Sequence, residues 1–79
     1  MKLKRDDRVE VEWLDQSYYH GPTEPTGATQ ECVGKTLGYF IEQDAKWLTL
    51  GMERFQTDRI SYRHIVTFPK VAILKIVRR

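Results

Sequence analysis

The chain is poor in cysteine, in asparagine and in long apolar runs. Its single cysteine, Cys32, excludes an intrachain disulfide, so a disulfide scaffold is ruled out and no oxidising compartment is required. No apolar stretch approaches the length of a membrane span, and the charged start MKLKRDDR is not followed by the apolar core of an export signal. These absences predict a cytoplasmic protein that makes no contact with a membrane.

Basic residues are missing from one part of the chain and concentrated in another. No Lys or Arg occurs between Val9 and Gly34, whereas seven basic residues and one acid, Asp58, occur from Arg54 onward. The net charge is only +2 and the isoelectric point is about 8.8, short of a strongly basic balance. Two interpretations stay open: the acidic and basic halves pair within the fold, or the last strands carry a face that binds phosphates. The second interpretation would use Arg54, Arg59, Arg63, Lys75, Arg78 and Arg79.

The length and composition predict one small globular domain over residues 1–79, because a chain this short cannot bury a second core. Five runs have the alternation or the apolar content of strands: residues 8–14, 33–43, 46–54, 60–68 and 71–77. They leave a charged N-terminal tail, residues 1–7, and one long loop, residues 15–32. No segment has a helical period. The predicted fold class is therefore all-β, with five antiparallel strands.

The order of these runs resembles the small five-stranded barrels of SH3-like and Sm-like type. A long first loop, tight later turns and a last strand that restarts just after Pro69 are typical of those folds. In them a 3₁₀ turn joins the last two strands, and the segment FPKV matches that turn. A short open sheet would expose two unpaired edges, so we expect a closed barrel. Gly34 and Gly38 are expected to supply bulges or sharp curvature.

The ligand-binding motifs of those two fold types are not present. Gly38, Phe40 and Asp44 fit the first Sm motif, but Leu48 stands where that motif has its base-binding asparagine. The A-L-Y-D-Y signature and the tandem tryptophan of the SH3 peptide groove are missing as well. The resemblance therefore implies a fold and transfers no ligand.

Three further segments, VEVEW, ECVGKTLGYFIEQDAKWLTL and VTFPKVAILKI, resemble a group of short uncharacterised proteins encoded by bacteriophages and prophages. Phe68 replaces an isoleucine of that pattern, and TLG at residues 36–38 replaces its S-V-G. The resemblance implies a phage setting, and with it the cytoplasm of the host cell. The group has no known function that could be transferred to this chain.

Gly34-Lys35-Thr36 matches the last three residues of the phosphate-loop motif. Thr29, however, occupies the position where that motif needs a glycine or an alanine. The chain is also too short for the strand, loop and helix that the motif requires. We predict no nucleotide cofactor.

Metal ligands and catalytic side chains occur without the spacing that their chemistry needs. His20, Cys32 and His64 are far apart along the chain, so no zinc site is predicted, and His64 is expected to be a packed or rim histidine. Asp15, Ser17 and His20 are the residue types of an acyl-transfer triad, but a triad depends on geometry and on an oxyanion hole. We therefore predict no catalytic residues, no metal and no cofactor.

Aromatic side chains form the candidate partner-binding site. Tyr18, Tyr19 and His20 lie together in the long loop, and Trp47 lies on the strand face opposite Leu48 and its apolar neighbours. Such rings supply large contact area at a small entropic cost, as binding hot spots do. The alternative is that a loop tyrosine folds over an open end of the barrel.

The segment VAILKIV is apolar on both strand faces, which indicates cover on both sides. That cover is either the long loop or another subunit, so a homo-oligomer is one option. Taken together, the sequence favours a non-enzymatic module that binds a protein partner or itself. The alternative is a barrel that binds nucleic acid through its basic C-terminal strands.

Overall fold

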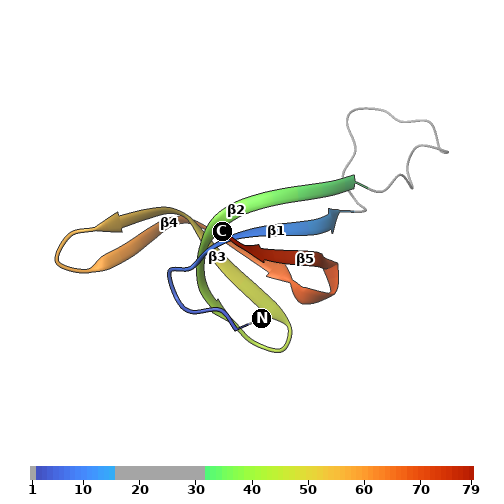
Figure 1. The fold of residues 1–79 in the computed structure, drawn as a ribbon, viewed down its shortest axis with the longest axis horizontal. Coiled ribbons are helices and arrows are strands. Elements are labelled where there is room, and N and C mark those ends of the chain that lie inside the picture. Colours follow the sequence, from blue (N-terminus) through green and yellow to red (C-terminus); the bar gives the residue numbers. More distant parts are fainter. Residues whose placement is uncertain (1, 16–31) are drawn as a thin grey trace.

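The computed structural model describes residues 2–15 and 32–79, without the side chains of residues 15 and 32 (Figure 1). Five strands and one 3₁₀ turn follow each other along these residues. They are β1 (Arg8–Asp15), β2 (Cys32–Gln43), β3 (Trp47–Gln56), β4 (Ile60–Pro69), η2 (Lys70–Ala72) and β5 (Ile73–Arg78). The predicted all-β class with five antiparallel strands is confirmed, and the predicted strand bounds differ from these by one or two residues.

The strands form a single sheet in the order β4-β3-β2-β1-β5, with antiparallel pairing throughout. Strands β4 and β5 are its two edges, and the pairings of the described residues do not join them. The predicted closure of the barrel is therefore wrong for this structure. Closure fails because β5 has only six residues beside β1, while the β3–β4 hairpin extends away from it (Figure 1).

The sheet is nevertheless strongly curved, because β2 pairs with two different strands along two parts of its length. Its first part pairs with β1 from Cys32 to Tyr39, and its last part pairs with β3 from Tyr39 to Gln43. The register shifts between Phe40 and Glu42, which leaves Ile41 as an extra residue at the bend. A second shift lies where β1 meets β5 at Trp13. The bulges are thus not at the glycines named for this role.

Gly34 and Gly38 do not form bulges but let neighbouring groups come close to the backbone of β2. A Cβ on Gly38 would lie 3.1 Å from the carbonyl oxygen of Gly51, and a Cβ on Gly34 would lie 2.8 Å from the Trp13 ring. That ring lies across Gly34 and donates a 2.9 Å hydrogen bond to the hydroxyl of Thr36. The β1–β2 ladder therefore uses glycine to seat a large aromatic side chain on its concave side.

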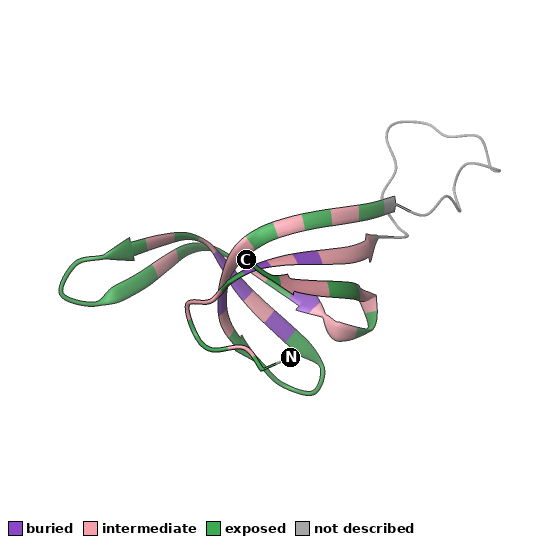
Figure 2. Cartoon of the chain, in the orientation of Figure 1, coloured by how far each residue is buried: buried purple, intermediate pink, exposed green. Residues whose placement is uncertain are grey.

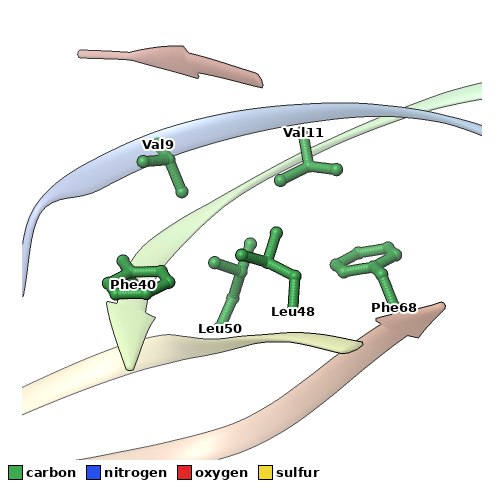
Figure 3. Packing of buried hydrophobic residues seen from close by; sticks show 6 residues of the cluster. All are labelled: Val9, Val11, Phe40, Leu48, Leu50 and Phe68. Carbon is green, nitrogen blue, oxygen red and sulfur yellow. The ribbon is translucent and has the colours of Figure 1, made fainter. Parts of the chain in front are cut away.

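The bend places β1 over β3 and β4, and the core lies between them (Figures 2 and 3). Val9 and Val11 of β1 point toward Leu48 and Leu50 of β3, and all four are fully buried. Phe40 and Phe68 complete the buried cluster, and partly buried Leu3, Trp13, Val66, Ile73 and Ile76 pack against it. The alternation expected for β1 and β3 is confirmed by this arrangement.

Residues 2–7, expected as a charged tail, are held along the bend of β2 by hydrogen bonds. The Asp6 N–H donates to the Phe40 carbonyl and the Phe40 N–H donates to the Asp7 carbonyl, each at 2.7 Å. The Arg5 Nε donates to the Ile41 carbonyl at 3.2 Å. Because a bulge removes ladder partners, these bonds satisfy backbone groups that the bend would otherwise leave unpaired.

The β3–β4 hairpin extends beyond the core as an arm whose end is exposed (Figures 1 and 2). At its base His64 has a φ of 57°, in the left-handed region that few non-glycine residues adopt. Gly51 is buried there, and a Cβ added to it would lie 2.7 Å from the Tyr62 Cβ and 2.8 Å from its ring. The Tyr62 side chain therefore packs directly against Gly51, where a residue with a Cβ would not fit without a shift.

Replacing Gly51 by alanine tests this contact. We expect Gly51→Ala to lower the free energy of unfolding by about 1–3 kcal/mol, because the clash involves the rigid Cβ of Tyr62 and the strand must shift. Urea denaturation followed by circular dichroism measures the change. The control is Ser61→Ala at an exposed position of β4, where a change within about 0.5 kcal/mol is expected. Equal stability of the two variants would contradict the close approach.

Candidate functional site

The turn between β2 and β3 holds Trp47 in a fixed position. The Asp44 carboxylate accepts hydrogen bonds from the N–H groups of Lys46 and Trp47, both at 2.8 Å. The Asp44 N–H donates to the Trp47 carbonyl at 3.0 Å, and the Lys70 N–H donates to the Lys46 carbonyl at 2.8 Å. An aspartate that bonds to the backbone of its own turn stiffens that turn. Trp47 therefore stands on a rigid support tied to η2.

Trp47 is exposed to 47%, as its strand phase predicts, and it lines a hollow of about 430 Å³. The other lining residues are polar: Glu42, Gln43, Asp44, Thr49 and Thr67. The hydroxyls of Thr49 and Thr67 lie 3.3 Å apart across the β3–β4 ladder. The hollow thus combines one large ring with acceptors and hydroxyls, a combination suited to a ligand that has an apolar part and polar groups.

One of the two acids that line this hollow, Asp44, is a fixed negative charge. Hydrogen bonds from the Lys46 and Trp47 N–H groups hold the pKa of Asp44 below its ordinary value, and the charge of Lys70 lowers it further. A carboxylate held in this way stays ionised near neutral pH and does not exchange protons there.

Of the four residues predicted for partner binding, the structure places one. Tyr18, Tyr19 and His20 lie outside the described residues, and only Trp47 is placed. The hollow around Trp47 was missed by sequence reasoning because its lining comes from three strands. The signal that was available is the Asp44 turn, which precedes an exposed tryptophan.

The six basic residues of the alternative prediction do not form one face. Arg54, Arg59 and Arg63 belong to the β3–β4 hairpin, whereas Lys75, Arg78 and Arg79 belong to β5 or follow it. Arg54 is paired with Asp6 at 2.6 Å, and the Arg63 guanidinium lies over the Phe55 ring at 4.7 Å. Among the described residues, the interpretation that the acidic and basic halves pair with each other holds for Arg79, whose Nη2 lies 2.9 Å from a Glu10 oxygen. The partner of Arg54, Asp6, precedes the acidic half.

The N-terminal segment, which the sequence predicted to be a tail, lies beside the basic residues at the end of β5. The Arg78 guanidinium donates to the Lys2 carbonyl at 3.4 Å, and the Arg79 N–H donates to the Arg8 carbonyl at 2.8 Å. These bonds place the start and the end of the described chain side by side. The basic residues that these bonds bring together are Lys2, Arg8, Arg78 and Arg79.

Asp6 is the centre of a polar junction that ties the N-terminal segment to the β3–β4 hairpin. It accepts from the Arg54 Nε at 2.6 Å and from the Tyr62 hydroxyl at 2.9 Å. The hydrogen bond from Arg54 lowers the pKa of Asp6, and the same bond raises the pKa of Arg54. Burial, with the hydrogen bond to Asp6, raises the pKa of Tyr62. Asp6 has a φ of 79°, which aspartate tolerates better than most residues.

Residues 2–15 and 32–79 contain no group of three or more His, Cys, Asp and Glu side chains that could hold a metal ion. The His64 side chain is 71% exposed and its Nε2 lies 2.8 Å from a Glu53 oxygen. Of the two expected placements of His64, packed or at the rim, the packed one is therefore wrong. The described residues also include no helix that is long and apolar enough to cross a membrane.

Comparison with known proteins gives no relative. No family model, no curated protein and no solved structure matches the chain. The choice of a candidate site therefore rests on the geometry of the described residues.

The Asp6 junction predicts a dependence of stability on pH. The folded state lowers the pKa of Asp6 below about 3.8, so its contribution is fully present above that pH and is lost as the pH falls through the lower folded value. We expect Asp6→Asn, which keeps the tolerance for positive φ, to unfold at lower urea concentration at pH 7. The difference from wild type should shrink in strong acid.

The matched control is Asp58→Asn at the tip of the hairpin, where the same change of charge removes no ion pair of the described residues. It should leave the urea midpoint at pH 7 close to that of wild type. A difference between Asp6→Asn and wild type that stays constant down to the lowest pH would contradict the role of the Asp6 charge.

Proposed function

We propose that this chain is a non-enzymatic module that binds a protein partner through the hollow at Trp47. The observation that carries the proposal is a half-exposed tryptophan held by a rigid turn beside ionised and hydroxyl groups. Tryptophan is one of the side chains enriched at binding hot spots. Its backbone is fixed by the turn, so little backbone freedom is lost on binding.

The chemistry of the hollow selects the kind of partner. Trp47 offers an apolar ring, Thr49 and Thr67 offer hydroxyls to a peptide backbone, and Glu42 offers a carboxylate at the rim. We therefore expect an extended segment with an apolar side chain next to a Lys or Arg. Two lysines lie near the rim, at Lys46 and Lys70, so the basic side chain of the partner is directed to Glu42 and away from them.

Kinship with the SH3-like and Sm-like small barrels is part of the proposal. The strand order β4-β3-β2-β1-β5 and the 3₁₀ turn η2 between β4 and β5 support it, although the sheet is open. The likeness of the sequence to short phage and prophage proteins supplies the setting, in which the partner is a host or virion protein.

Removing the indole tests the proposal. Peptides selected on the wild-type protein from a displayed random library should carry an apolar residue beside Lys or Arg. We expect Trp47→Ala to weaken their binding at least about tenfold, because a hot-spot ring is lost. Titration calorimetry measures the affinities, and thermal unfolding shows whether the fold is retained.

Phe55→Ala is the matched control, since Phe55 is another exposed aromatic residue, on the hairpin arm away from the hollow. It should bind the selected peptides as wild type does. Selected peptides that bind Trp47→Ala as tightly as wild type would exclude the hollow as the site.

A second form of the proposal is self-assembly at β5, which the apolar content of this strand favours. Val71 is 97% exposed in η2 and Leu74 is 54% exposed in β5, at an edge whose backbone groups lack a neighbouring strand among the described residues. Exposed edge strands are sites where a second chain adds. The occupant proposed here is another copy of this chain.

Sedimentation velocity tests this form. We expect the wild type to exceed its monomer mass of 9.4 kDa as concentration rises, and Leu74→Lys to remain a monomer. Ile60→Lys, the same change at an exposed residue of β4, is the control and should associate as wild type does. A wild-type protein that stays monomeric at the highest concentration would rule out self-assembly.

A further inference from the structure

We propose that a second site, at the joined ends of the described chain, binds single-stranded nucleic acid, with a base in the hollow at Tyr39 and phosphates on Arg8 and Arg79. This site shares no lining residue with the hollow at Trp47. The proposal is thus independent of the function proposed above.

The hollow at Tyr39 has the shape and lining for a flat ring that carries an anionic group. Its volume is about 300 Å³, and Leu37, Tyr39 and Met52 give it apolar and aromatic walls. Arg8 and Arg79 also line it. Guanidinium groups match the geometry of phosphate oxygens and can bind them through two parallel bonds.

Tyr39 is held in place by its neighbours. It pairs with Arg8 across the β1–β2 ladder and with Gly51 across the β2–β3 ladder. The Tyr62 ring supports it with 6.4 Å between ring centroids and a tilt of 40°, and Tyr62 is itself fixed by its bond to Asp6. An aromatic ring fixed in this way is a stacking platform for a base.

The charge around the hollow favours a strand over a single nucleotide. Arg8 and Arg79 line the hollow, and hydrogen bonds between the start and the end of the described chain bring Lys2 and Arg78 beside them, so several phosphates in succession can be contacted. Asp6 does not oppose them, because it is paired with Arg54. Two acids remain, Asp7 at 3.7 Å from Arg78 and Glu10 at 2.9 Å from Arg79.

These two acids leave donors available on the arginines. A guanidinium has five N–H donors, and Glu10 engages the Nη2 of Arg79 with one oxygen. The hollow favours a single strand because the bases of a duplex are stacked and paired, whereas an unstacked base can enter a pocket and meet an aromatic ring.

The test uses fluorescein-labelled oligo(U) and oligo(dT), with binding measured by fluorescence anisotropy over a salt titration. The wild type should bind both with a log–log salt dependence. Arg8→Gln with Arg79→Gln should reduce that slope by about 1.4, because each phosphate contact on a single strand contributes about 0.7. Tyr39→Leu should weaken binding about fivefold or more with the slope unchanged, and Tyr39→Phe should bind as wild type does.

The matched control is Arg59→Gln with Arg63→Gln, which removes the same charge from the hairpin arm and should leave binding unchanged. Equal loss from both double variants, a folded Tyr39→Leu that binds like wild type, or equal affinity for duplex DNA, for uridine monophosphate or for phosphatidylglycerol vesicles would overturn the proposal. Trp47→Ala should bind the oligonucleotides normally, so failure here is distinct from failure of peptide binding.

Discussion

The structure depends on the bend of β2. This strand pairs with β1 before Tyr39 and with β3 after it, and the extra residue Ile41 lets the chain turn between the two ladders. Without the bend, the valines of β1 could not face the leucines of β3, and a single sheet of this size would have no core. Because the bulge removes backbone partners, the fold also depends on the N-terminal segment that supplies them.

The same constraint decides how charge is distributed. Asp6 reaches Arg54 because the N-terminal segment is hydrogen-bonded along the bend of β2. This ion pair leaves Arg54 less available to bind a phosphate. The backbone of that segment meets the end of β5, so Lys2 and Arg8 join Arg78 and Arg79. A basic region arises from residues at the two ends of the sequence, which charge counts along the chain do not bring together.

A small open sheet has more surface than its core can cover, and the uncovered parts differ in chemistry. The hollow at Trp47 has carboxylate and hydroxyl walls, whereas the hollow at Tyr39 has apolar walls and two guanidinium groups. The strand β5 has exposed apolar side chains on a sheet edge. These surfaces would attract different partners, which is the physical basis for treating them as separate sites.

The sequence by itself determined the strands and their faces. Alternation put Val9, Val11, Leu48 and Leu50 inside and Trp47 outside, since side-chain direction along a strand is a local property. Only the tertiary structure decided that the sheet stays open, that His64 turns outward, and which side chains line each hollow. These features depend on where strands distant in sequence meet and on a bulge at Ile41. Local pattern carries no information about such meetings, because they are set by the packing of the whole chain.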